Sequence, residues 1–298
     1  MNRIRIILIL AAAAIMASCT KELDIDYRQV EPIYILQADI TDSPAKAQLT
    51  RSRDMSDPAK PAGIGDAQIV LRDDQGRSEE LVFGSDGYYR SPSGWVGETG
   101  RTYTLTATID GKQYAATSTM RPAATLDSIG YIWLSTSGMK MLIMQCYHTY
   151  PEGVNQNYTY VTATKNGDFF RNQAAKQFNP QERNAIALLG CTTEKVMDED
   201  EPDKQDVILH DGDKVHVELW TIDLPVYDYF SSLRSSQQNA SQPLTNFTEV
   251  PANAITASAT SASSSAVGAA VPAQLTGYFS AHHTSAIDLT FYRSQIKE

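Results

Sequence analysis

The chain has 298 residues, with 25 Lys and Arg against 35 Asp and Glu, a formal net charge of −10. A hydrophobic content of 42% is ample for globular cores, and a chain of this length favours two domains. Nucleic acid is excluded as an expected partner, because binding a polyphosphate requires clustered Lys and Arg and the chain has no such run.

Residues 1–18 have the order of a secretory signal peptide. Arg3 and Arg5 precede an apolar stretch from Ile6 to Ala17. A charged start followed by such a stretch is typical of signal peptides. The stretch is shorter than the ~20 residues that span a bilayer, so an uncleaved membrane anchor is the weaker alternative.

Cys19 ends the tetrapeptide MASC, which resembles the lipobox of bacterial lipoproteins. In a lipobox the cysteine thiol receives a diacylglycerol, cleavage makes this cysteine the first residue, and its new amine is acylated. Several acyl chains hold a protein at a membrane far more firmly than a single chain. We therefore expect a lipid-anchored outer-membrane protein with a polar tether over residues 19–32.

Residues 33–122 have the pattern of a β-sandwich domain. Short apolar runs are separated by turn signals, and over 102–109 threonine alternates with apolar residues. One buried face produces this period of two. Asp110-Gly111 then supplies a two-residue hairpin turn. The sequence therefore predicts an immunoglobulin-like or transthyretin-like sandwich.

Residues 123–298 predict a second β-rich domain that carries one or two short helices. Hairpin turns are expected at Asn166-Gly167 and Asp211-Gly212. These turns separate runs rich in β-branched and aromatic residues, which favour strands. The fold class expected for the whole chain is therefore mainly β.

A helix is expected at DLPVYDYFSSLRSSQQ, with Asp223 as its N-cap and Pro225 in its first turn. Its apolar face consists of Val226, Tyr227, Phe230 and Leu233. Tyr227 and Tyr229 could bind a sugar. Packing of the helix on the sandwich is the favoured alternative, since it explains the same residues without a ligand.

The end of the second domain contains a low-complexity tract. Residues 252–271 are rich in Ala, Ser and Thr and have little to bury, so we expect a mobile loop. The segment LTGYFSAHHTSAIDLTFYR follows and alternates like a strand. It is expected to pair back into the second domain.

Cys146 and Cys191 are the two cysteines that remain once Cys19 is assigned to lipid. An even pair in an oxidising compartment predicts a disulfide. The alternative is that Cys146 serves as a small buried hydrophobic residue, because it lies in the apolar segment MLIMQCYHTY. Both interpretations remain open at this point.

The sequence offers no recognisable catalytic motif. The strings FGSDG and PSGWVG lack the order Gly-x-Ser-x-Gly of a hydrolase elbow. His210 and His216, with Asp211 and Asp213 between them, are the best metal hypothesis, but they do not form a recognised zinc motif. We therefore predict no catalytic residues, no metal and no cofactor.

Two further sets of side chains could contribute to binding. The adjacent His282 and His283 would point to opposite faces of a strand, so they are not expected to serve one ion. Trp95, Trp133 and Trp220 could stack on sugars, but in the sequence they are indistinguishable from core residues. The ligand-binding residues are therefore not predicted.

Several segments spread along the chain carry a resemblance. They are Cys19-Thr20-Lys21-Glu22, GDAQIVLRDDQG, DGYYRSP, GRTYTLTATIDGKQYAATSTM, LDSIGY, YDYFSSLR and LTGYFSA. Together they resemble Bacteroidota outer-membrane lipoproteins of the domain of unknown function 4249 family. The resemblance implies an envelope lipoprotein that is often encoded beside a TonB-dependent transporter and has no established reaction. The Ala/Ser tract departs from the family, which usually has a shorter loop there.

Ser128 lies in Asp127-Ser128-Ile129, which resembles the O-glycosylation acceptor of this phylum. The alternative is that the Ser128 hydroxyl caps a turn. For the whole protein we expect a non-enzymatic surface lipoprotein that assists nutrient uptake by a TonB-dependent transporter. A structural or adhesive envelope lipoprotein is the alternative, and a surface hydrolase is the third hypothesis.

Overall fold

Strands make up most of the structure, so the prediction of a mainly β fold is confirmed. The computed structural model describes residues 32–53, 59, 61–136, 139–154, 156–178, 184–193, 208–240, 256–257 and 275–296. The predicted signal peptide, Cys19 and all of the tether except Pro32 lie outside the described residues.

The first sheet has nine described strands in the order β14-β7-β6-β3-β4-β5-β2-β1-β15. They are β1 (Tyr34–Ile40), β2 (Lys46–Arg51), β3 (Gln68–Asp73), β4 (Ser78–Phe83), β5 (Tyr89–Arg90), β6 (Thr102–Ile109), β7 (Lys112–Thr119), β14 (Thr256–Ala257) and β15 (Leu275–Ala281). Strand β15 also contacts β6 and β7, so the sheet folds back on itself. The short β14 lies within the tract that was expected to be a loop.

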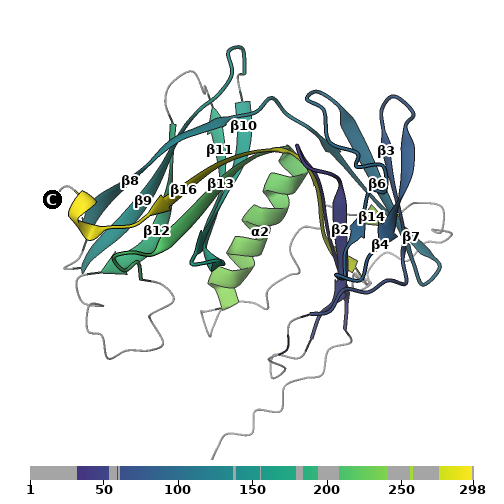
Figure 1. Ribbon diagram of the computed structural model, residues 1–298, viewed down its shortest axis with the longest axis horizontal. Coiled ribbons are helices and arrows are strands. Elements are labelled where there is room, and N and C mark those ends of the chain that lie inside the picture. Colours follow the sequence, from purple (N-terminus) through teal and green to yellow (C-terminus); the bar gives the residue numbers. More distant parts are fainter. Residues whose placement is uncertain are drawn as a thin grey trace, which may run out of the picture. The chain divides into compact units, whose positions relative to one another are not determined.

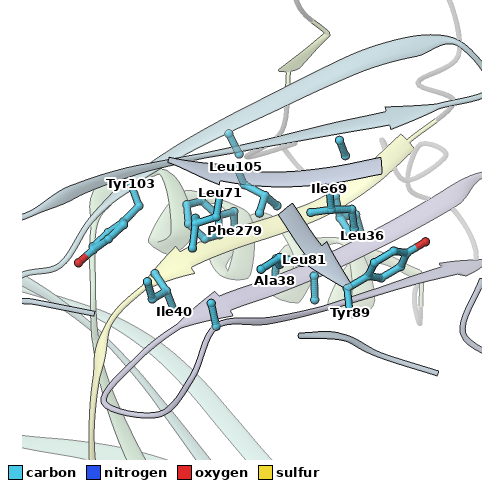
Figure 2. Packing of buried hydrophobic residues seen from close by; sticks show 14 of the residues in the cluster. Leu36, Ala38, Ile40, Ile69, Leu71, Leu81, Tyr89, Tyr103, Leu105 and Phe279 are labelled. Atoms are coloured by element: carbon cyan, nitrogen blue, oxygen red, sulfur yellow. The ribbon is translucent and has the colours of Figure 1, made fainter. Parts of the chain in front are cut away.

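One hydrophobic core fills the inside of this sheet. Leu36, Ala38 and Ile40 alternate along β1, and they meet Leu71 of β3 and Phe279 of β15 (Figure 2). All five side chains are at most 2% exposed. The period of two therefore leaves the other face of β1 for polar side chains. The predicted hairpin turn between β6 and β7 is also confirmed by the positive φ of its two residues.

Strand β15 is placed differently from the prediction. It pairs in parallel with β1 in the first sheet, rather than with the second domain. Only the segment after it, β16 (His283–Thr290), pairs with the later strands. The alternating sequence suggested one continuous strand, but the structure divides it at His282. Before this residue β15 is buried at all seven positions, and after it β16 alternates between half-buried and exposed residues. The domain boundary after residue 122 stays a prediction.

Two smaller sheets enclose a second core. Their orders are β11-β10-β13-β16 and β12-β9-β8. The strands not yet given are β8 (Thr125–Thr136), β9 (Met139–Thr149), β10 (Gln156–Lys165), β11 (Asp168–Phe178), β12 (Asn184–Thr193) and β13 (Lys214–Ile222). The core contains Leu142 and Met144 of β9 and Val217 and Leu219 of β13. Contacts of β16 with β8, and of β11 with β12, bring the sheet edges together.

Helix α2 (Leu224–Ala240) begins where the sequence predicts. The Asp223 carboxylate accepts a hydrogen bond from the Val226 amide at 3.4 Å, as an N-cap does. The helix contacts β10, β11 and β15 (Figure 1). Its Phe230 ring stacks on Tyr160 with 4.0 Å between ring centroids. A 3₁₀ turn, η4 (Arg293–Gln295), follows β16. Among the described helices, none is long and apolar enough to cross a membrane.

Candidate functional site

The polar face of β1 and its neighbours carries a row of functional side chains. Asp39 of β1 lies opposite Lys46 of β2 and opposite Ser280 of β15. Lys46 in turn lies opposite Arg90 of β5. Side chains at directly paired positions share one face of a sheet. An acid, two bases and a hydroxyl therefore lie in one row across four strands.

A cleft of about 920 Å³ lies over this row. Its floor includes Gln37, Asp39 and Lys46, and Tyr278 joins them from β15. The other side is lined by Glu218, Trp220, His282 and Thr284. These come from β13, from β16 and from the junction before it. The cleft thus lies where the polar face of the first sheet meets strands of the four-stranded sheet.

Asp39 and His282 form a buried acid and base in this cleft. Their side chains are 14% and 2% exposed, and Asp39 Oδ1 lies 4.0 Å from His282 Nδ1. Burial disfavours the charged form of each group. Burial therefore raises the pKa of Asp39 to about 7 and lowers the pKa of His282 to about 3. At neutral pH the histidine is uncharged, and the carboxyl is divided between its two forms.

Among the described residues, the hydrogen bonds in the cleft leave one buried acceptor, an oxygen of Asp39, without a donor. The His282 Nδ1 atom is 2.8 Å from the Ser280 hydroxyl, and the His282 ring stacks on Trp220 with 4.4 Å between centroids. Asp39 Oδ1, in contrast, is buried and has no hydrogen-bond partner among the described residues. A buried oxygen without a donor carries a desolvation cost. The Asp39 side chain is 14% exposed where it lines the cleft, so a ligand whose donor reaches the carboxyl would remove that cost.

The histidines of the metal hypothesis have separate partners. His210 Nδ1 lies 3.7 Å from the Asp213 carboxylate. His216 lies between Glu218 and Asp288, at 3.0 and 2.8 Å, and these hydrogen bonds raise its pKa. In the described part of the chain, no three His, Cys, Asp or Glu side chains are placed to hold a metal ion.

Cys146 and Cys191 occupy neighbouring strands of the three-stranded sheet. Cys146 of β9 is fully buried in the core, and its register partner on β12 is Ile186. The side chain of Cys191 lies outside the described residues, and its neighbour Thr192 pairs with Leu142. A disulfide requires Cα atoms within about 7 Å of each other. The bridge stays a prediction, and this register does not favour it.

The remaining predicted residues are distributed over core and surface. Trp95 is 3% exposed and belongs to the first core, whereas Trp133 packs partly against the second core. Tyr229, proposed as a sugar contact, is 5% exposed and packs with Tyr278, which supports the packing alternative. Ser128 lies half-buried in β8, and its glycosylation stays a prediction.

Of the residues that line this cleft, the sequence analysis named Trp220 as a possible sugar contact but missed the acid and the base of its floor. His282 was considered only together with His283, as a pair not expected to bind one ion, and Asp39 and Lys46 were not singled out. One signal was available, because Asp39 lies between Ala38 and Ile40 in an alternating strand. Such a position marks the face opposite the core but does not reveal what covers it. His282 reaches the cleft through a pairing of distant segments.

The fold and the cleft together define a β-sandwich protein with a polar cleft between its sheets and no recognisable catalytic motif in its sequence. The family model described as domain of unknown function (DUF4249) matches residues 20–263. The chain therefore belongs to this family. No curated protein matches the chain.

Two solved structures are distantly similar to the chain. A two-domain fibronectin type III segment of chicken tenascin is 9% identical with a TM-score of 0.21, covering 65% of this chain and 93% of that one. A DUF4785 family protein of Legionella pneumophila is 11% identical with a TM-score of 0.24, covering 62% and 52%.

Proposed function

We propose that this protein is a lipid-anchored binding protein of the outer-membrane surface, which captures a small polar ligand for a TonB-dependent transporter. The observation that carries the proposal is the cleft, where no described residue donates a hydrogen bond to the buried Asp39 Oδ1. Binding sites are typically concave and place a few polar groups where they fix the orientation of a ligand. The cleft has both properties.

The geometry of the cleft supports binding better than hydrolysis. Ser280, His282 and Asp39 are the residue types of a hydrolase triad, but Ser280 and Asp39 both approach Nδ1 of His282. A triad requires the serine at one ring nitrogen and the carboxylate at the other. Ser280 is also fully buried, and a His282 pKa of about 3 makes a poor general base at neutral pH.

The lipid anchor has a direct test in Cys19→Ala. The variant is expected to lose palmitate labelling completely and to accumulate as unprocessed precursor, because no other thiol lies at the end of the signal peptide. Labelling and gel mobility in cells measure both effects. Cys146→Ala is the control, and it should be lipidated normally. Labelling that survives Cys19→Ala contradicts the anchor.

The proposed partner is tested by gentle solubilisation. We expect the lipidated protein to co-purify with a TonB-dependent transporter encoded near it, because confinement to one membrane raises the effective concentration of both proteins. Protease added to intact cells should also digest the protein. The Cys19→Ala variant controls for contacts formed after lysis. Protection from the protease, or recovery of periplasmic partners only, would favour the structural or adhesive alternative.

A further inference from the structure

The charged side chains that line the cleft form two groups, according to whether another described residue already forms a hydrogen bond or ion pair with them. Glu218 accepts a hydrogen bond from the Trp220 indole at 2.8 Å and lies 3.0 Å from His216. Asp42 also lines the cleft, and its carboxylate lies 2.8 Å from Nδ1 of His283, which is not a lining residue. These two acids are therefore compensated within the protein.

The same separation applies to the bases. Arg90 forms an ion pair with Asp86 at 2.5 Å. Lys46 is exposed and makes no ion pair or hydrogen bond within bonding distance among the described residues, although its positive charge lies close enough to lower the pKa of both Asp39 and His282. Among the acids, Asp39 has a buried oxygen to which no residue in the described part of the chain donates a hydrogen bond. One acid and one base, directly opposite each other on β1 and β2, thus attract each other but form no hydrogen-bonded ion pair in the described cleft.

We propose that the ligand of the cleft is a small zwitterion, an amino acid or a short peptide, whose ammonium binds Asp39 and whose carboxylate binds Lys46. This inference rests on the proposed function as a binding protein. An ammonium is the donor that best compensates a buried carboxylate, since charge-assisted hydrogen bonds are the stronger kind. A carboxylate is the corresponding anion for an unpaired lysine.

The dimensions of the cleft agree with such a ligand. Opposite side chains of paired strands have Cβ atoms about 5 Å apart, and the flexible stem of Lys46 extends its reach further. An extended chain spans at most about 3.5 Å per residue, so a tripeptide places its two ends within about 10 Å. The volume of about 920 Å³ leaves room for the side chains of a tripeptide.

A neutral sugar is the main competing ligand. Its hydroxyls could donate to Asp39, and Trp220 lines the cleft as well. One face of Trp220 is already covered by the His282 ring, so its capacity to stack on a sugar is reduced. A sugar would also leave Lys46 without an anion. The zwitterion satisfies both open groups at once.

Calorimetry with trialanine and the twenty amino acids tests the proposal on the full mature chain. N-acetyl-trialanine is expected to bind the wild type at least ~10-fold more weakly than the free peptide, and C-terminal amidation should have a similar cost. In Asp39→Asn, acetylation should make no further difference. In Lys46→Gln, amidation should make none. This crossed pattern assigns each end of the ligand to one residue.

Matched controls separate these effects from general damage. Asp168→Asn and Lys112→Gln remove equivalent charges outside the cleft lining and should bind like the wild type. Gln48→Trp should block the cleft, whereas Gln113→Trp, on an exposed position of β7, should not. Circular dichroism checks that each variant is folded.

Three results would overturn the zwitterion. They are absence of binding by every amino acid and by trialanine at millimolar concentration, equal binding of blocked and free peptides, and binding that survives Gln48→Trp. If maltotriose binds instead and Gln48→Trp abolishes this, the protein is a binding protein for neutral sugars. The proposed function then stands and the zwitterion fails. The proposed function itself fails separately, through the transporter experiment.

Discussion

Asp39→Asn is expected to raise the free energy of unfolding above that of the wild type, by an amount that grows as the pH rises from about 4 to about 7. Burial raises the pKa of this carboxyl from 3.8 to about 7, so the folded state keeps a proton that the unfolded state loses. Stability from Asp39 is therefore fully present below pH 4 and is lost as the pH rises to 7. At about 1.4 kcal/mol per pKa unit, the gain at pH 8 is up to about 4 kcal/mol.

The measurement is the free energy of unfolding in urea at several pH values, taken as the difference between variant and wild type. Taking the difference removes the contribution of His282, which is present in both proteins. Burial lowers the pKa of His282 from 6.5 to about 3. Its contribution is present above pH 6.5 and is lost as the pH falls, which is the opposite slope. Between about pH 4 and pH 6.5 the two slopes have opposite signs and nearly cancel in the wild type.

His282→Gln provides the complementary control, since it should expose the falling slope that Asp39 produces. Asp168→Asn, at the exposed first residue of β11, should give a flat difference curve. A flat curve for Asp39→Asn would show that the carboxyl is not buried in solution.

Gly277→Ala is expected to destabilise the protein by ~3 kcal/mol or more. A Cβ at this position would lie 1.8 Å from the carbonyl oxygen of Leu36, on the neighbouring strand β1. The φ of +138° is also a conformation that L-residues rarely adopt. Because the clash is with backbone, it can be relieved only by separating β15 from β1.

Gly76→Ala is the matched control for the backbone angle. Its φ is +91°, but a Cβ there would have nothing within 4 Å. It should cost about 1 kcal/mol, the cost of the left-handed conformation alone. The midpoint of urea unfolding compares the two variants. Equal shifts would mean that β15 does not pair with β1 as closely as described.

The features that could be predicted from the sequence are those encoded by neighbouring residues. The hairpin at Asp110-Gly111 follows from two adjacent residues with positive φ. The start of α2 follows from Asp223, whose side chain caps an amide three positions later. In both cases a few consecutive residues determine the structure, and a single sequence contains all of them.

The cleft could not be predicted, because its residues meet only through distant pairings. Asp39 lies near the start of the described chain and His282 near its end, and β15 brings them together. The pattern of β1 showed which face is polar, but not that His282 and Trp220 would cover it. The shifted pKa values of Asp39 and His282 result mainly from burial in the folded protein, so they could not be predicted from the sequence either.

The pairing of β15 with β1 has a consequence for how the chain reaches its folded state. Residues 42 and 283, which are hydrogen-bonded beside this pairing, are 241 positions apart. Contacts of such high sequence separation are slow to form. Until they form, one edge of β1 presents unpaired amides and carbonyls, which are a template for association with other chains. A chain that ends before residue 275 lacks β15, so that edge of β1 stays unpaired. We expect such a truncated chain to aggregate more readily than the full-length chain.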